Sequence, residues 1–229
     1  MPLAGEKARP ARTGFPAGAG GASMAMMSDN PAPEPDAQAE NRTFVLILQH
    51  PQERREPLAT AAAAAATLRR ARLVVGLSWP NLARALGRNA DPRRWGVLYL
   101  GSVQPAALAS ASNLVLLNRN GEPVDDPDPV MRGLEGIVLL DGTWSQAKTL
   151  WWRNPWLLKL NRLVLNPPRP ARLGRLRREP RREALSTIEA AALALRRLES
   201  TPAAADALLA ALDRLIAEAR RPRQPAAGA

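Results

Sequence analysis

A carboxylate and a hydroxyl that directly follow a short apolar run could bind a ligand and take part in its chemistry. The run is Ile137 to Leu140, which predicts a strand buried on both faces. Asp141, Gly142 and Thr143 come next, and apolar residues then recur at helical spacing from Trp144 to Trp152. Gly142 permits a sharp turn. The pattern predicts a strand, a turn and a helix that present Asp141 and Thr143 at the carboxyl end of a central strand, where open α/β sheets bind ligands.

The only histidine of the chain, His50, also follows a predicted strand, and Glu53 lies three residues further on. The strand covers Thr43 to Leu48 and is apolar on both faces. One interpretation is a loop histidine that Glu53 caps. The other is an active-site position, in which His50 and Glu53 either support the site or transfer a proton.

A third group of polar residues opens a predicted helix at Ser186. Ser186 and Glu189 have the spacing of a capping box. Free amides and hydroxyls at this helix start, Ser186 and Thr187 among them, could also bind the carboxylate of a ligand. The cap and the ligand site are compatible with one another.

An arginine-rich segment precedes that helix. Residues 169–182 contain a single acid, Glu179, and prolines interrupt the segment. Such a run is often only a solvated surface, but its place before the Ser186 motif favours contact with a phosphate backbone. The arginines are Arg169, Arg172, Arg175, Arg177, Arg178, Arg181 and Arg182.

Four pieces of the chain resemble, in order, the motifs of one known family. Asp141-Gly-Thr-Trp144 resembles the D-x-T-W signature of the DTW-domain family, the tRNA-uridine aminocarboxypropyltransferases. His50-Pro-Gln-Glu53 resembles its H-P-x-E, Leu176-Arg-Arg178 its L-R-K segment, and Ser186-Thr-Ile-Glu-Ala190 its S-T-x-E-A. The pieces together span roughly residues 44–199, and their order makes the resemblance specific.

The resemblance implies transfer of the 3-amino-3-carboxypropyl group of S-adenosylmethionine (SAM) to N3 of a tRNA uridine, with no metal. It implies that Asp141 either accepts the N3 proton or holds the donor's amino group. Thr143 and Gln146 would hydrogen-bond the donor, and Trp144 would either stack on a base or pack in the helix core. Leu140, Leu100 and Gly101 are assigned to the SAM site. Gly101 could let the cofactor approach the backbone closely, or it could be only a turn.

Two departures from the family pattern separate this chain from its relatives. The cysteine-rich segment that commonly precedes H-P-x-E is missing, because the chain has no cysteine. Tyr99-Leu100-Gly101 stands where relatives tend to have an aromatic residue followed by proline. The competing hypotheses are a SPOUT-like RNA methyltransferase and a basic RNA-binding protein without catalytic activity.

The elements that must position these groups alternate between strands and helices. Strands are predicted at 72–77, 95–100, 113–118 and 161–166 besides the two above, and helices at 58–70, from Ser186, and at 203–220. Trp151, Trp152 and Trp156 are predicted to pack in the core or against a helix. This order predicts an α/β fold, a mainly parallel sheet with helices on both faces. The resemblance adds a SPOUT-like fold and the hypothesis of a knot near the C-terminus.

Composition bounds the remaining expectations. With 32 Lys and Arg against 21 Asp and Glu, the net charge of +11 favours a polyanionic partner, here tRNA. No apolar run is long enough to span a membrane, so a cytoplasmic protein is expected. Residues 1–40 are predicted to be a disordered extension, 41–220 the DTW domain and 221–229 a disordered tail. The sequence does not determine the oligomeric state.

Overall fold

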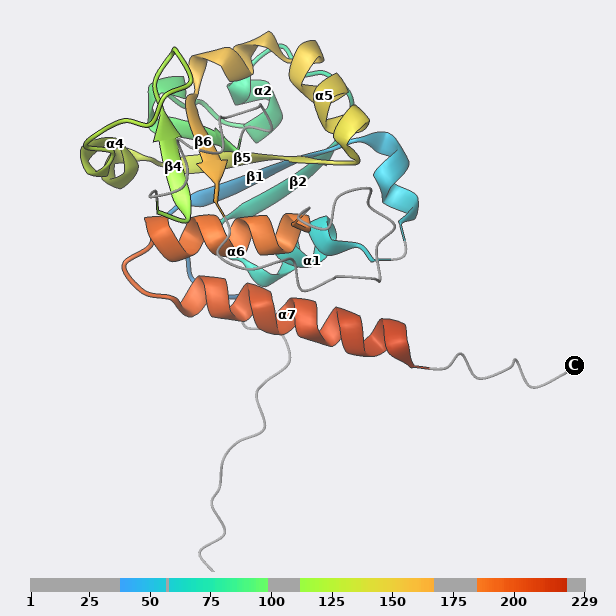
Figure 1. Cartoon of the computed structure of the whole chain (residues 1–229). Helices are drawn as coiled ribbons and strands as arrows, with labels where there is room; N and C mark the ends of the chain where they lie inside the picture. Colours follow the sequence, from blue (N-terminus) through green and yellow to red (C-terminus); the bar gives the residue numbers. More distant parts are fainter. Residues whose placement is uncertain (1–37, 57, 99–111, 167–184, 222–229) are drawn as a thin grey trace, which may run out of the picture. The chain divides into compact units, whose positions relative to one another are not determined.

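Six strands form one sheet in the computed structural model, which describes residues 38–56, 58–98, 112–166 and 185–221 (Figure 1). The strand order is β2-β1-β5-β3-β6-β4, and all neighbours are parallel except β4 and β6. The strands are β1 (Phe44–Gln49), β2 (Ala71–Val75), β3 (Trp95–Leu98), β4 (Leu114–Leu117), β5 (Gly136–Asp141) and β6 (Asn161–Leu165).

The register of the central strands decides which loops meet. In the pairing of β1 with β5, Phe44 lies opposite Gly136 and Gln49 lies opposite Asp141. Both strands therefore end at the same level, and the segments that follow them start side by side at the carboxyl edge of the sheet.

Both faces of the sheet are buried, as the apolar strands predict. Val45 and Ile47 of β1 point to one hydrophobic cluster, whereas Leu46 and Leu48 point to the other. The first cluster is formed with residues of α1 (Thr60–Thr67), α4 (Asp128–Gly133), α6 (Thr187–Leu198) and α7 (Ala203–Arg220). The second is formed with residues of α2 (Leu82–Leu86), α5 (Trp144–Arg153) and the 3-10 helix η3 (Pro155–Lys159). Figure 1 shows α6 and α7 below the sheet and α2 and α5 above it.

The predicted α/β architecture, a mainly parallel sheet with helices on both faces, is confirmed. The predicted helix at 203–220 matches α7. The strand predicted at 113–118 forms β4, which the sequence did not distinguish from the others, although it alone among the described strands runs antiparallel to its neighbour.

The helix predicted at 58–70 is shorter than expected, because α1 ends at Thr67. Leu68 forms a β-bridge with Ala39, and the Arg69 main-chain N–H donates to the Ala39 carbonyl at 3.0 Å. This pairing draws the chain out of the helix before β2. It also places Ala39 against the domain, whereas the sequence predicts a disordered extension over residues 1–40. The division at residue 41 otherwise stays a prediction.

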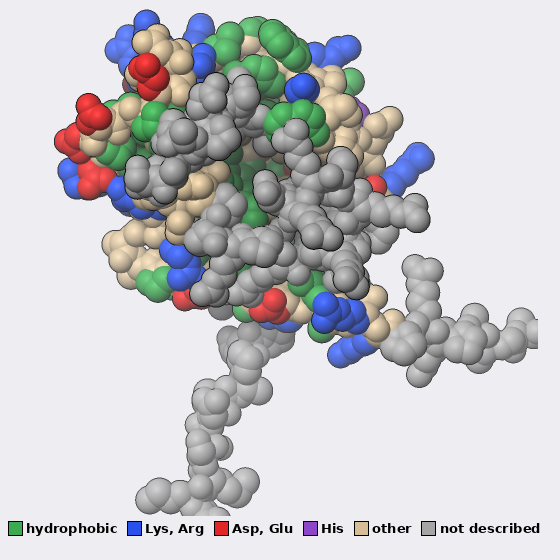
Figure 2. Space-filling view, viewed as in Figure 1, with side chains coloured by type: hydrophobic (Ala, Val, Ile, Leu, Met, Phe, Trp, Pro, Cys, Tyr) green, Lys and Arg blue, Asp and Glu red, His purple; other side chains and the backbone are tan. Residues whose placement is uncertain are grey.

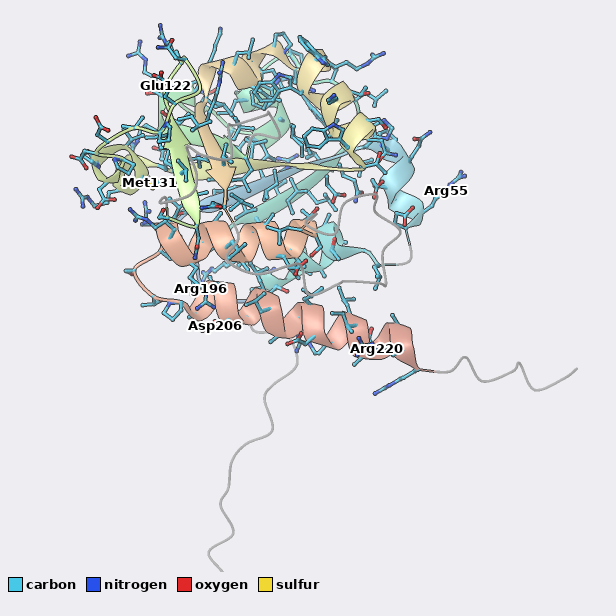
Figure 3. All side chains as sticks on the ribbon, viewed as in Figure 1. Arg55, Glu122, Met131, Arg196, Asp206 and Arg220 are labelled. Atoms are coloured by element: carbon cyan, nitrogen blue, oxygen red, sulfur yellow. The ribbon has the colours of Figure 1, made fainter. Side chains whose placement is uncertain are left out.

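Helix α6 is held at the amino edge of the sheet by its C-terminal end. The Glu199 carboxylate accepts hydrogen bonds from the main-chain N–H groups of Arg42 and Thr43, at 3.0 and 2.7 Å. The Arg42 guanidinium donates to the Leu198 carbonyl at 2.9 Å. On the outer side of α6, Arg196 and Asp206 join α6 to α7 by an ion pair (Figure 3). These contacts fix the C-terminal end of α6 at the amino edge of the sheet, and its first turn therefore lies at the carboxyl edge.

The end of α5 is fixed by one fully buried amide, Asn154. Its Oδ1 accepts from the main-chain N–H of Trp79 at 2.8 Å and from the indole N–H of Trp156 at 3.2 Å. Its Nδ2 donates to the carbonyls of Leu150 and Leu77, at 2.7 and 3.0 Å. Asn154 thus satisfies the polar groups of three segments on the face of the sheet that α5 covers.

Candidate active site

The Asp141 carboxylate lies buried, 4% exposed, at the carboxyl end of the central strand β5. Its Oδ2 accepts a hydrogen bond from Gln49 Nε2, at 2.8 Å, and its Oδ1 accepts one from the Thr187 hydroxyl. Gln49 ends the neighbouring strand β1, and Thr187 begins helix α6. Three segments that are distant in the sequence therefore meet at one carboxylate.

The first residues of α6 form the predicted capping box. The Glu189 carboxylate accepts from the main-chain N–H and from the hydroxyl of Ser186, at 3.0 and 2.6 Å. Ser186 Oγ in turn accepts from the Glu189 N–H at 3.4 Å. Since the Thr187 hydroxyl donates to Asp141, both hydroxyls at this helix start are engaged within the protein. Among the described residues, what remains for a ligand is the main-chain N–H of Thr187 and of the next residue.

The turn after Asp141 is shaped by Gly142 and closed by a second capping box. Gly142 has φ +157°, and a Cβ built on it would lie 2.8 Å from Gln146 Cβ. The Thr143 main-chain N–H donates to Gln146 Oε1 at 2.6 Å, and the Gln146 N–H reaches Thr143 Oγ1 at 3.5 Å. Thr143 and Gln146 therefore start α5, as Ser186 and Glu189 start α6.

The His50 segment lies beside this turn. The His50 main-chain N–H donates to the Asp141 carbonyl at 3.0 Å, and its Nδ1 accepts from the Gln52 N–H at 3.3 Å, which caps the 3-10 helix η1 (Pro51–Arg55). Gln146 Nε2 donates to Gln52 Oε1 at 3.1 Å. Glu53 is buried on η1, and its main-chain N–H donates to the His50 carbonyl. His50 thus has a clear structural role here, and a chemical one stays a prediction.

This arrangement combines a buried anion with a helix start. In the part of the chain that the structure describes, the Asp141 carboxylate has neutral donors and no ion pair. A cation placed against a buried carboxylate is stabilised by the charge attraction. Beside it, the N-terminus of α6 carries a partial positive charge from the helix dipole. The site can therefore attract a cationic group and an anionic group that lie close together on one ligand.

Comparison with known proteins assigns the chain to a family. The family model described as the DTW domain matches residues 31–220. The chain belongs to the DTW-domain family. It is 33% identical over 162 residues to a protein of Drosophila melanogaster named tRNA-uridine aminocarboxypropyltransferase 2, covering 69% of this chain and 57% of that protein. A Mus musculus protein of the same name is 29% identical over 176 residues, covering 76% of this chain and 53% of that protein.

This DTW domain thus spans little more than half the length of the curated relatives it matches. No solved structure matches the chain significantly. The resemblance that the sequence motifs indicate is confirmed by the family model and by the relatives.

Several residues assigned to the site lie in the DTW domain as expected. Asp141, Thr143 and Gln146 surround the turn, and Ser186 and Thr187 lie at the start of α6. Leu140 precedes Asp141 on β5 and is partly buried. Trp144, the first residue of α5, is 48% exposed, so it is not a core residue. Their roles toward a ligand stay predictions.

One tryptophan was predicted wrongly. Trp156 is buried and Trp151 packs partly against the core, as expected, but Trp152 is 79% exposed. Adjacent residues of a helix point about 100° apart, so Trp151 and Trp152 cannot both face the sheet. Since Leu150 and Trp151 take the inner side, Trp152 faces outward.

Other predicted site residues lie outside the described residues. These are Leu100 and Gly101 of the SAM site, and Arg169, Arg172, Arg175, Arg177, Arg178, Arg181 and Arg182 of the RNA-binding segment. Their roles stay predictions.

Gln49 belongs to the site, although none of the sequence motifs includes it. It is 6% exposed and donates to Asp141 from the neighbouring strand. A signal was present in the sequence, because Gln49 is a polar residue between an apolar strand and the His50 motif. Only the parallel pairing of β1 with β5, in register, reveals its partner.

The described residues contain neither a cluster of metal ligands nor a membrane-spanning helix. Among these residues, no group of three or more His, Asp and Glu side chains lies where it could hold a metal ion. The described helices also include none with the length and apolar character to cross a bilayer.

We expect Gly142→Ala to lower the free energy of unfolding by about 2 kcal/mol. The new methyl group would crowd Gln146 Cβ and disfavour the positive φ, so the start of α5 would have to shift. Urea denaturation measures the change. The matched control is Gly133→Ala at the end of α4, where an added Cβ meets nothing within 4 Å, and which should change stability by less than about 1 kcal/mol. Equal stability of the two variants would contradict a strained turn.

Proposed function

We propose that this protein transfers the 3-amino-3-carboxypropyl group of SAM to N3 of a uridine in tRNA. Membership of the DTW family and the names of the relatives support transfer of this group to a tRNA uridine. The proposal adds two details to this support, SAM as the donor and N3 as the acceptor atom. The proposed reaction uses no metal ion.

The observation that carries the proposal is the hydrogen bond between Thr187 and Asp141. It joins the D-G-T-W motif to the S-T-x-E-A motif and sets a carboxylate beside a helix N-terminus. The amino-acid end of SAM carries an ammonium, a carboxylate and a nearby sulfonium. The Asp141 carboxylate suits the cationic groups, and the main-chain N–H groups at the start of α6 suit the carboxylate. The residues present therefore fit this donor.

In the proposed reaction, the bond between N3 and the γ-carbon forms while the bond between that carbon and sulfur breaks. The electron pair of the broken bond stays on sulfur, and methylthioadenosine leaves. N3 must lose its proton before or during the attack. Asp141 either accepts this proton or holds the donor's ammonium, and Gln49 and Thr187 keep its carboxylate in place in either case.

We infer that tRNA binds the basic surface of the domain. The net charge of +11 favours a polyanion, and the arginines of residues 169–182 would contact its phosphates. A SPOUT-like fold with a knot near the C-terminus and a cytoplasmic location belong to the same proposal.

The decisive assay follows two labels of SAM separately. With SAM labelled in the carboxypropyl carbons, label should enter tRNA in proportion to turnover, whereas methyl label should leave in methylthioadenosine. The reason is that the nucleophile must lie in line with one carbon–sulfur bond, so one orientation transfers one group. Scintillation counting of recovered tRNA, with chromatography of the small products, measures both.

The competing functions give different results in this assay. Methyl label in tRNA, with release of S-adenosylhomocysteine, would establish the methyltransferase alternative instead. Binding of tRNA with neither label transferred, and no calorimetric signal for SAM, would indicate an RNA-binding protein without catalysis.

A further inference from the structure

The solvent-exposed side of α5 carries aromatic and cationic side chains in one row. Trp144, Lys148 and Trp152 are spaced four residues apart, so each lies about one turn beyond the last. Trp152 is 79% exposed and Trp144 48% exposed. Lys148 Nζ lies 5.5 Å from the centre of the Trp144 ring, a cation–π arrangement. Arg153 follows Trp152, is also exposed, and points about 100° further around the helix. We name these four residues the α5 row.

Helix α5 and the 3-10 helix η3 that follows it carry basic side chains and no acidic ones. The sequence has no Asp or Glu between Asp141 and Glu179, and in that stretch η3 adds the exposed Lys159 and the 55% exposed Leu158. Figure 2 shows hydrophobic and basic side chains over the top of the molecule, where Figure 1 places α5 and η3. Acidic side chains gather instead at the left, over α4.

This composition fits nucleic acid better than other occupants. Tryptophans alternating with cations are the groups on which unpaired bases stack while phosphates contact the charges. A protein partner would be expected to meet some acidic residues at the rim, and the described part of α5 and η3 has none. Because α5 carries no acidic side chain, none would repel the phosphates of a nucleic acid along its length.

The α5 row also begins at the candidate active site. Trp144 is the first residue of the helix whose N-cap, Thr143, lies two residues after Asp141. At 1.5 Å per residue, Trp152 lies about 12 Å further along the axis. RNA lying on α5 would therefore run directly away from the reacting uridine.

We propose that the α5 row is a stacking surface for the unpaired nucleotides of tRNA that neighbour the target uridine. This inference rests on the proposed function, and it names the surface that recognises the substrate. Trp152 stacks on a base, while Lys148 and Arg153 contact phosphates. The residues of the α5 row are not part of the arginine segment at 169–182 in the sequence.

The test measures binding of unmodified tRNA by the full chain at several salt concentrations. Trp152→Ala should weaken binding by roughly 5- to 100-fold, because one stacked base is lost. Trp152→Phe, which keeps an aromatic face, should stay within about 3-fold of the wild type. The double variant Lys148→Gln with Arg153→Gln should reduce the slope of log affinity against log salt by roughly 1.5 to 2 units.

The matched control removes two arginines from the opposite face of the sheet. Arg214→Gln with Arg220→Gln lowers the net charge equally, and both residues are exposed on α7. Figure 3 labels Arg220. This control should change the salt slope by less than about half a unit. Far-ultraviolet circular dichroism and the affinity for SAM should be unchanged in every variant, because none of these side chains is buried.

The outcomes separate this inference from the proposed function. If carboxypropyl label enters tRNA but the α5 variants bind tRNA as the wild type does, the stacking surface is overturned and the function stands. If the α5 variants lose tRNA but neither label is transferred by the wild type, the proposed function fails and the RNA surface stands. Altered self-association by sedimentation, with tRNA binding unchanged, would overturn the inference in favour of a contact between copies.

Discussion

Asp141→Asn should lower the rate of carboxypropyl transfer by a factor of about 10² to 10⁴ and leave the protein folded. The substitution removes the negative charge but keeps the shape. The carbonyl of the new side chain could still accept from Gln49 Nε2, and its amide could donate to the Thr187 hydroxyl oxygen, so both hydrogen bonds of the wild type have replacements. Single-turnover kinetics with labelled SAM measures the rate, and calorimetry measures the dissociation constant for SAM.

These two measurements distinguish the two roles of Asp141. If it is the base, the rate falls while SAM binding stays within about tenfold of the wild type. If it holds the donor's ammonium, the dissociation constant for SAM rises together with the loss of rate. Asp206→Asn makes the same chemical change at an exposed position of α7 and should have no effect on either quantity. Near-wild-type turnover of the Asp141 variant would exclude both roles.

Asn154→Ala should lower the free energy of unfolding by about 3 kcal/mol, which is the largest stability effect we expect from a single polar residue. The variant removes the side-chain acceptor of the Trp79 N–H and the donor to the carbonyls of Leu77 and Leu150, at a fully buried position. The indole of Trp156 keeps a second acceptor, the Trp79 carbonyl at 2.9 Å, so the loss is not complete.

Chemical denaturation measures this loss, and Asn120→Ala is the control. Asn120 is exposed in the turn after β4, so its variant should change stability by less than about 0.5 kcal/mol. The Asn154 variant should also loosen the end of α5, which a limited protease would detect near Trp152. A stability close to that of the Asn120 variant would show that water replaces the lost hydrogen bonds.

The architecture was predictable because the local patterns agree with it. The apolar runs of β1 and β5 indicate strands buried on both faces, apolar spacing indicates α5, and the capping box at Ser186 marks where α6 begins. These are local signals, so one chain suffices to find them. The antiparallel direction of β4 is not local, because it depends on pairing with β6.

The candidate site was predictable in its parts but not in its connections. Asp141 follows from the strand and the turn. Its two hydrogen-bond donors come from Gln49 and Thr187, and nothing in either segment reveals that proximity in space. The exposed Trp152 was missed for a different reason. Of two adjacent tryptophans on a helix, composition suggests that both are core, and only the packing of Leu150 decides which one faces solvent.

The contact between Thr187 and Asp141 also limits how this protein can be recombined. The two residues lie 46 positions apart, yet their side chains form a buried hydrogen bond with one another. A chimera of two DTW proteins with its crossover between β5 and α6 would inherit them from different parents. Such a hybrid would stay compatible only where both parents place a hydroxyl and a carboxylate at these positions. A crossover before β1 keeps Gln49, Asp141 and Thr187 together as one heritable unit.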